Sequence, residues 1–520
     1  VHKLLGLDLN DVKQNTGSAT VTVGTNGVTG SRDLNGVECE FVDLYDMFFD
    51  EDGSLRTDYQ AFAKTAAKIS SFRLGGTASA KVNFMNTIGA MSERKESTFI
   101  TLPEGSSWTV GEKSSDVMRM GVIEYLKVIY ANNPNASFIP CISMMTMTPQ
   151  ETSDFIHFLT DDVSTDWGAK RAALGIENPV NVKYVELTNE CDQYTDSGRS
   201  WYINLAKDHI AAINTANQDV KIMACGPTAP WGNSNWKSWV ECVAENLGAQ
   251  IDAISFHPYY YGHASGTLLE YIYEIKSILD KKVPNNDIKI SLTEHGRDWG
   301  YNKNGHTSNM LAAVMQSYFI QALSKLNYVD GAYLNGFVTS DSDLWQYWIC
   351  KNNEWYTSPL QKSLGLLNSS VGIGTLETSV NYVDSTSVWP EDFSNRSLED
   401  LVNITTEKIS DNEIKIIMSN IAAYTDVDLQ FNLGEKYDLV KEEVLSSPNM
   451  DTYAYDAYSA NLTQITVDET EIENFSLYKL PAMKVVVLTL QKADGSKKLN
   501  EDFSSYGDVA QKSGEDSDKL

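Results

Sequence analysis

The chain has 520 residues, of which 42% are hydrophobic and 21% are charged, values close to those of ordinary globular proteins. This length exceeds that of one compact domain, so we expect a barrel of roughly 250 to 400 residues and a second, smaller module. The formal net charge of −29 disfavours nucleic acid and anionic membranes as partners, because the protein's own field would repel them, and it leaves neutral substrates as the better fit.

Strand-like and helix-like segments alternate along the chain up to about residue 350. This alternation is typical of βα units that form a parallel sheet. Eight such units in one run predict a closed (β/α)8 TIM barrel, and no G-x-G-x-x-G follows the first strand to indicate a dinucleotide-binding sheet. The eight expected strands are residues 3–9, 70–76, 137–143, 182–188, 220–226, 251–257, 288–294 and 331–337.

The sequence changes character after about residue 375. Apolar runs at 412–422, 426–434 and 483–491 are separated by turn residues, which predicts an antiparallel β-sandwich. The last residues are rich in Ser, Gly, Asp and Lys, which is typical of a flexible tail or linker. We therefore expect the barrel over 1–375, the sandwich over 376–492 and the tail over 493–520.

The six cysteines lie far apart and form no C-x-x-C pair, so we expect free thiols. No run approaches the ~18 apolar residues that a membrane span requires, and the N-terminus lacks the regions of a signal peptide. The chain begins at Val1 and not Met, which fits a processed or trimmed terminus, and its N-x-S/T sequons do not establish secretion because a chain rich in Asn, Ser and Thr contains some by chance. The location stays open, with a secreted one favoured over the cytoplasm. The sequence does not indicate an oligomeric state.

Polar side chains follow several of the expected strands at the point where each strand ends. In a (β/α)8 barrel the reacting groups lie at these carboxyl ends, so the side chains there should share one pocket. The residues are Arg73, Asn189, Glu190, His257, Tyr259, Glu294 and His295.

Two of these residues, Glu190 and Glu294, are carboxylates on different strands. Hydrolysis of a glycosidic bond needs such a pair, one carboxyl to protonate the leaving oxygen and the other to attack the anomeric carbon or activate water. A single glutamate at a strand end is more often a solvated loop charge, and His257 taken alone is more often a core histidine. The coincidence of both glutamates with Arg73, His257 and Tyr259 favours the catalytic interpretation.

The combination of N-E after the fourth strand, H-x-Y after the sixth and T-E at the seventh resembles clan A of the retaining glycoside hydrolases. Within the clan the sequence is most similar to family 51, the α-L-arabinofuranosidases. The stretches that carry this resemblance are residues 54–77, 86–94, 139–151, 171–190, 251–260 and 290–299.

The resemblance implies that Glu190 is the general acid/base and Glu294 the nucleophile of a double displacement that needs no metal or cofactor. It further implies that Asn189 binds the sugar hydroxyl beside the anomeric carbon and that Tyr259 supports the nucleophile. Arg73 and His257 would complete the surrounding shell. Among the aromatic residues near the strand ends, Trp299 is a further candidate for binding the carbohydrate substrate.

Four positions depart from the family pattern. The glutamate that binds the sugar at the end of the first strand would be Asn10 here, and a tryptophan of the second loop would be Phe84. An asparagine of the third strand would be Ser143, and the tryptophan after the nucleophile would be His295, which we place in the sugar-binding shell. Because all four changes concern the sugar subsite, a β-glycanase or β-glycosidase of the same clan stays open as an alternative.

Two other classes of function are weighed against this one. A metal-dependent barrel hydrolase could use His257, His263, His295 and Asp252, but the expected first strand has no H-x-H ligand pair. A non-catalytic carbohydrate-binding protein is disfavoured because both glutamates are present.

Overall fold

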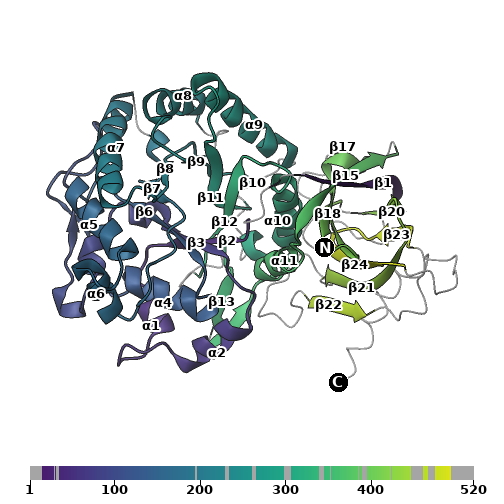
Figure 1. Cartoon of the computed structure of the whole chain (residues 1–520), viewed down its shortest axis with the longest axis horizontal. Helices are drawn as coiled ribbons and strands as arrows, with labels where there is room; N and C mark the ends of the chain where they lie inside the picture. Colours follow the sequence, from purple (N-terminus) through teal and green to yellow (C-terminus); the bar gives the residue numbers. More distant parts are fainter. Residues whose placement is uncertain are drawn as a thin grey trace.

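The computed structural model describes residues 15–28, 30, 34–193, 196–228, 233–260, 265–297, 306–338, 345–351, 353–383, 386–388, 395–422, 424–446, 461–466 and 475–493. A barrel surrounded by helices lies beside a separate sheet-rich domain, with α10 (Met310–Leu323) and α11 (Pro359–Asn368) between them (Figure 1). The predicted architecture is confirmed: an eight-stranded parallel barrel is followed by a largely antiparallel β-domain.

The barrel closes through eight strands that pair in one parallel ring. The order is β2–β3–β6–β7–β8–β9–β11–β12, and β12 pairs with β2 to close the ring. These strands are β2 (Gly36–Glu40), β3 (Ser71–Gly75), β6 (Ser137–Ile142), β7 (Val185–Leu187), β8 (Ile222–Ala224), β9 (Ala253–Ser255), β11 (Lys289–Arg297) and β12 (Val329–Asn335).

The first barrel strand is therefore β2, and the prediction that residues 3–9 form it is wrong. The ring is complete once β2 joins β12 to β3, so it has no place for another strand. Residues 3–9 themselves lie outside the described residues. The prediction failed because residues 3–9 form an apolar run that looks like a strand. Strand β2 has the sequence GVECE, whose two glutamates make it look less like a buried strand.

Helices cover the outside of the barrel and bury an apolar layer against the strands (Figure 1). Several have the start signals that their sequences predict: Thr148 caps α5 in a capping box with Glu151, with Pro149 in the first turn. The main helices are α2 (Thr57–Thr65), α4 (Val122–Asn132), α5 (Pro149–Thr160), α6 (Asp166–Ala173), α7 (Asp196–Ala216), α8 (Trp236–Leu247) and α9 (Ser265–Lys282), followed by α10 and α11.

Shorter elements decorate the loops. These are α1 (Tyr45–Phe48), α3 (Gly76–Ser79), β4 (Ser97–Thr98), β5 (Lys113–Ser115), β10 (Tyr259–Tyr260), β13 (Trp348–Lys351), β14 (Glu354–Thr357) and the 3-10 turns Phe84–Thr87, Met91–Glu93, Cys191–Gln193, His306–Ser308 and Leu398–Asp400. Strand β10 adds to the barrel by pairing in parallel with the end of β11, which brings Tyr259 beside Gly296.

The β-domain is one nine-stranded sheet. Side chains from β1 and β24, which are not neighbours in the sheet, share one apolar core, so the sheet folds over on itself like a sandwich. Its strands, in spatial order, are β22 (Asn461–Thr466), β21 (Tyr437–Ser446), β24 (Lys484–Lys492), β19 (Glu413–Asn420), β18 (Val402–Lys408), β15 (Gly374–Tyr382), β1 (Asn15–Val28), β20 (Thr425–Asn432) and β23 (Leu477–Leu480), with β16 (Thr386–Val388) and β17 (Asn395–Ser397) as a separate hairpin.

The domain boundaries differ from those expected in one respect. Strand β1 precedes the barrel in sequence but pairs with β15 and β20, so residues 15–28 belong to the β-domain and not to the barrel expected over 1–375. The expected tail, apart from Ala493, lies outside the described residues.

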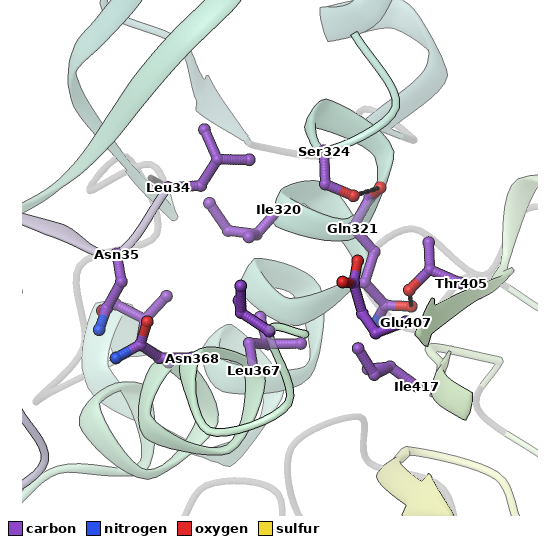
Figure 2. Close-up of a pocket in the computed structure, with 12 residues that line it drawn as sticks. Leu34, Asn35, Ile320, Gln321, Ser324, Leu367, Asn368, Thr405, Glu407 and Ile417 are labelled. Atoms are coloured by element: carbon purple, nitrogen blue, oxygen red, sulfur yellow. Dashed lines mark hydrogen bonds between the residues drawn. The ribbon is translucent and has the colours of Figure 1, made fainter. Parts of the chain in front are cut away.

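Helix α10 joins the two domains. All fourteen of its residues are buried, because one side faces the barrel and the other faces the β-domain. Ser317 hydrogen-bonds Ser419 of β19 at 2.7 Å, and Asn403 of β18 donates to the Tyr318 carbonyl at 3.1 Å. Beside this contact lies a small cavity lined by apolar and polar side chains, most of them from α10, α11, β18 and β19 (Figure 2).

Among the described residues, no helix is both long enough and apolar enough to cross a membrane.

Candidate active site

The inside of the barrel is divided into an apolar floor and a charged upper layer. Ile139, Tyr184, Met223, Ala253 and Tyr333 form the floor as one buried cluster. Because side chains alternate along a strand, the residues two positions further along also point inward, one layer closer to the carboxyl end. That upper layer contains Cys141, Glu186, Ser255 and Asn335, and on β2 and β3 it contains Glu38 and Arg73.

Arg73 lies at the centre of the upper layer and is completely buried. Its Nε and Nη2 donate to the two oxygens of Glu186 at 2.5 and 3.2 Å, and its Nη1 donates to Glu294 Oε1 at 2.9 Å. A further bond from Nη2 to Asn189 Oδ1, at 2.7 Å, orients the amide of that side chain. One guanidinium therefore connects the ends of β3, β7 and β11.

Both oxygens of Glu294 are held by neighbouring side chains. Arg73 donates to its Oε1, the Tyr259 hydroxyl donates to its Oε2 at 2.6 Å, and His257 Nδ1 lies 3.7 Å from Oε2. Asn335 in turn donates to the Tyr259 oxygen at 2.6 Å. Burial alone would raise the pKa of the Glu294 carboxyl, but His257, Arg73 and the Tyr259 hydroxyl outweigh it and hold this pKa below its usual value.

Glu190 lies on the other side of the pocket and is more accessible. Its Oε1 lies 3.0 Å from His257 Nδ1, and Gln193 donates to its Oε2 at 3.0 Å. Its side chain is 23% exposed, against 8% for Glu294, so Glu190 is the carboxyl that a leaving group can reach.

The backbone that carries Glu190 is strained. Thr188 and Glu190 have φ values of 63° and 52°, which side-chain-bearing residues rarely adopt and β-branched threonine least of all. Hydrogen bonds hold this turn: the Thr188 hydroxyl donates to the Ile142 carbonyl at 3.2 Å and accepts from the Met144 amide at 2.9 Å. The strained turn ends β7 abruptly and aims Glu190 into the barrel mouth.

The two glutamates and His257 form one cluster. Single ligand atoms of Glu190, His257 and Glu294 all lie within 4.8 Å of one another. Such a set could in principle hold a cation, but Arg73 and the hydroxyl of Tyr259 already occupy Glu294, and a guanidinium 2.9 Å away repels a cation. The donor arrangement fits a carboxylate pair better than a metal site.

The structure brings six of the eight predicted site residues together: Arg73, Asn189, Glu190, His257, Tyr259 and Glu294. Trp299 lies outside the described residues. The remaining residue, His295, does not face the pocket.

His295 lies on the outer side of β11. Its partner in register on β12 is Leu334, which belongs to the apolar layer between strands and helices, and paired residues face the same side of a sheet. The imidazole is fully buried beside Tyr260 and Phe319, and this burial lowers its pKa to about 3. Placing His295 in the sugar-binding shell was therefore wrong. The register of β11 shifts between Leu292 and His295, so that Thr293 and Glu294 both face the barrel interior while His295 faces outward.

The alternative metal site is also not assembled. Asp252 precedes β9 at the opposite end of the barrel, where its Oδ2 accepts from the Ile222 amide at 2.8 Å. Asp252 and His257 lie at opposite ends of β9, so they cannot bind the same metal ion. His295 lies on the outer side of the barrel wall. His263 lies outside the described residues.

Two acidic residues of β2 were missed. Glu38 and Glu40 alternate with Val37, Cys39 and Phe41, so both glutamates point into the barrel. Glu40 ends the first barrel strand and is exposed at the mouth, whereas the assignment of this place to Asn10 was wrong because residues 3–9 are not the first strand. The alternation in GVECEF is the signal that could have identified this strand.

Glu38 lies one layer below Glu40 and is 1% exposed. Its Oε1 is 3.6 Å from Arg73 Nη1, and neither oxygen has a hydrogen-bond partner among the described residues. Burial, followed by the charge of Glu294, raises the pKa of Glu38 well above its usual value. The site therefore contains a third buried acid, whose raised pKa favours the protonated form, beneath the two predicted catalytic ones.

Phe84 and Ser143, the other two departures, do not face the pocket. Phe84 is fully buried and packs edge-on against Phe41 and Phe155. Ser143 is buried and donates to the Ala80 carbonyl at 2.6 Å. These positions therefore say little about which sugar binds.

A cleft leads from Glu190 to the outside. It is lined by Thr77, Ala80, the loop 104–108, Met145, Asn189, Glu190 and Gln193. Trp108 forms its aromatic wall and is held by stacking on Phe99, with ring centres 5.1 Å apart, and by Lys81 above the ring. This aromatic surface was not predicted, because the loop carries no strand or helix pattern that would place it near the site.

Comparison with known proteins gives a consistent result. The model of the α-L-arabinofuranosidase 1 domain matches residues 65–266. α-L-Arabinofuranosidase 2 of Arabidopsis thaliana is 28% identical over 176 residues, which are 34% of this chain and 22% of that protein. An intracellular exo-α-(1→5)-L-arabinofuranosidase of Bifidobacterium longum is 21% identical over 29% of this chain and 27% of that protein. The alignments thus span about a quarter of the length of these relatives.

Solved structures match over nearly the whole chain. A family 51 α-L-arabinofuranosidase from Bifidobacterium longum has a TM-score of 0.73 at 16% identity, covering 92% of this chain and 100% of that one. The α-L-arabinofuranosidase from Thermotoga maritima has a TM-score of 0.71 at 18% identity, covering 91% and 100%. At these identities the structural matches establish the fold. Together with the sequence matches they confirm the predicted resemblance to glycoside hydrolase family 51.

Proposed function

We propose that this protein is a retaining glycoside hydrolase that cleaves α-L-arabinofuranosides, with Glu294 as the nucleophile and Glu190 as the general acid/base. The observation that carries the proposal is the pairing of two carboxyls with oxygens within 4.8 Å of each other, one held by Arg73 and Tyr259 and the other open to the cleft. Retaining enzymes hold their carboxyl groups about 5 to 5.5 Å apart, whereas inverting ones leave about 6.5 to 9.5 Å for a water molecule.

In the first step the Glu294 carboxylate attacks the anomeric carbon. The bond to the leaving oxygen breaks, its electron pair stays on that oxygen, and Glu190 supplies the proton. Glu294 suits the nucleophilic role because its pKa is held low, so it is anionic when the substrate arrives. Arg73 and Tyr259 keep the attacking carboxylate in a fixed orientation.

In the second step water hydrolyses the glycosyl ester on Glu294. Glu190, now a carboxylate, takes a proton from this water, which attacks the anomeric carbon from the side that the leaving group occupied. Two displacements restore the original configuration and regenerate both carboxyls. The accessible position of Glu190 at the cleft serves both the departing alcohol and the entering water.

The neighbouring polar groups are suited to binding the sugar. Arg73 donates to Asn189 Oδ1 and thereby turns the amide NH2 of Asn189 away from itself, as a donor for a sugar hydroxyl. Glu40, at the mouth, takes the place of the first-strand glutamate that the resemblance to family 51 implies. Partial burial and the charge of Glu294 raise the pKa of Glu40, which favours a shared hydrogen bond with a hydroxyl over a free charge.

Glu40, as the glutamate at the end of the first barrel strand, favours arabinofuranosides over the β-glycosides of the same clan. The argument for β-glycosides rested on Asn10, Phe84 and Ser143. Phe84 and Ser143 do not face the pocket, and Asn10, which lies outside the described residues, does not follow the first barrel strand β2. Trp108 and Met145 provide an apolar wall on the leaving-group side, which suits a sugar or aryl aglycone.

A panel of aryl glycosides tests the proposal. The wild-type protein should hydrolyse aryl α-L-arabinofuranosides at least tenfold faster, by kcat/KM, than the corresponding β-xyloside, β-glucoside and β-galactoside. Glu294→Gln should lower kcat by about 10⁴-fold or more, whereas Glu51→Gln, an exposed matched control, should be unchanged. Preference for a β-glycoside would overturn the sugar assignment, and an active Glu294→Gln variant would overturn the nucleophile.

A further inference from the structure

His257 connects the two proposed catalytic carboxyls to a third, buried one. The imidazole is 2% exposed and follows β9. Its Nδ1 lies 3.0 Å from Glu190 Oε1, and its Nε2 lies 2.9 Å from the Thr293 hydroxyl. Thr293 is fully buried and lies 3.2 Å from Glu186 Oε1. These contacts form one chain from Glu190 through His257 and Thr293 to Glu186.

The direction of the hydrogen bonds in this chain is determined at its Glu186 end. Arg73 donates to both oxygens of Glu186, so this side chain is a carboxylate that only accepts. The single hydroxyl hydrogen of Thr293 therefore goes to Glu186. The Thr293 oxygen is left to accept, and the donor it faces is His257 Nε2–H.

The protonation of His257 follows from this direction. Because Nε2 carries a hydrogen whether the ring is neutral or charged, Nδ1 is the atom that gains and loses a proton. This atom faces Glu190 Oε1 at 3.0 Å and Glu294 Oε2 at 3.7 Å. Glu190 and His257 thus share one exchangeable proton.

We propose that Glu186 and Thr293 are positioning residues that fix the Nε2–H form of His257, so that the proton Glu190 needs as general acid is held between Glu190 Oε1 and His257 Nδ1. The naming of Glu190 as the acid rests on the proposed function, while the hydrogen-bond directions do not. Before the first displacement the Nδ1–H bond breaks and an O–H bond forms on Glu190. That O–H bond then breaks as the proton passes to the leaving oxygen.

The charges around His257 support this arrangement. The charged groups that act on His257 are Glu294 of β11, Glu190 and Asp192 after β7, and Arg73 of β3. Glu186 is linked to His257 through the Thr293 hydroxyl. Burial lowers the pKa of His257, but Glu294 and the hydrogen bond to Glu190 outweigh burial and raise it. These charges therefore favour the protonated imidazole, whose Nδ1 faces Glu190.

Thr293→Val and Thr293→Ser separate this role from packing. Valine keeps the volume but removes the acceptor for Nε2–H, whereas serine keeps the hydroxyl. A cation loses more than a neutral ring when its acceptor is removed, so Thr293→Val should lower the alkaline apparent pKa of kcat/KM by about one unit. With a methoxyphenyl α-L-arabinofuranoside, a poor leaving group, kcat/KM should fall about tenfold; with the dinitrophenyl glycoside, which needs no acid, it should change less than threefold. Thr293→Ser should behave as the wild type.

Imidazole ¹⁵N NMR of the free wild-type protein gives a readout that needs neither turnover nor a Thr293 variant, with His257→Gln used to assign the signals. We expect Nε2 of His257 to stay protonated across the titration while Nδ1 titrates. A deprotonated Nε2 in the neutral ring would overturn the inference, as would a Thr293→Val variant that loses activity equally on both glycosides without moving the alkaline limb. If the wild type cleaves none of the glycosides, the proposed function fails, and the NMR titration still decides the tautomer.

Discussion

The two sides of the pocket each hold a glutamate, but in opposite surroundings. On the β11 side, Glu294 is nearly buried, with one oxygen bound by Arg73 and the other by Tyr259. On the β7 side, Glu190 is three times as exposed and contacts only the adaptable groups His257 and Gln193 among the described residues. Fixed donors keep a carboxylate anionic, while a partner that itself titrates lets a carboxyl gain and lose a proton. The difference in surroundings, and not the residue type, assigns the two roles.

The largest effect that separates the two sides is expected from Glu190→Ala. Removing the acid should lower kcat/KM for a methoxyphenyl α-L-arabinofuranoside by about 10³-fold, because the leaving oxygen no longer receives a proton. The dinitrophenyl glycoside should lose far less in its first step. Steady-state kinetics with both substrates check this, and equal losses on the two would mean that Glu190 is not the acid.

Arg73→Lys tests the fixed side of the pocket. Lysine keeps the charge but cannot bind Glu186 with two parallel bonds while also reaching Glu294 and Asn189. We expect kcat to fall about 10²-fold and the free energy of unfolding to fall by about 3 kcal/mol, since buried carboxylates lose partners. Activity assays and urea unfolding measure the two effects; a variant with wild-type values in both would show that Arg73 does not organise the site.

Tyr259→Phe removes one donor from Glu294 and leaves the rest of the site in place. Losing this donor should raise the pKa of Glu294, so the acidic limb of the kcat/KM profile should move to higher pH by up to about one unit. We expect kcat/KM at neutral pH to fall about tenfold. An acidic limb that stays in place would indicate that this limb reports a group other than Glu294.

Glu38→Gln tests the raised pKa of the buried acid below both sides. Because the folded protein holds the pKa of Glu38 above its unfolded value, the folded state keeps a proton that the unfolded state releases, so wild-type stability falls as pH rises above about 4.5. Glutamine has no such proton. The unfolding free energy of Glu38→Gln, relative to that of the wild type, should therefore increase as pH rises, by up to about 1.4 kcal/mol per pH unit. Urea unfolding at pH 5 and pH 8 measures it, and a constant difference between the two proteins would show that Glu38 is ionised in the fold.

The sequence was informative where apolar runs end in polar residues. Strands β3, β7 and β11 keep enough apolar residues to be recognised as strands, although Arg73 interrupts β3 and Glu186 interrupts β7. Their carboxyl ends, and with them Arg73, Glu190 and Glu294, could therefore be placed without coordinates. Strand β2 could not, because its inner face is acidic and only its outer face looks like a strand.

The groups proposed to fix the protonation of His257 could not be recognised from the sequence either. Glu186 sits inside an apolar strand and Thr293 looks like an ordinary β-former, so neither stands out until Arg73 and His257 are seen beside them. His295 shows the reverse error: adjacency to Glu294 suggested a shared pocket, but after the register shift of β11 the two side chains lie on opposite faces.

The most direct test of the assignment of Glu294 as the nucleophile is to trap the glycosyl ester that it forms. Glu190→Ala treated with a dinitrophenyl α-L-arabinofuranoside should complete the first displacement and stall in the second, which needs a base. Peptide mass spectrometry should then find one pentosyl group on the peptide that contains Glu294. A pentosyl group on another carboxylate, such as Glu40, or steady turnover without any adduct, would contradict the account.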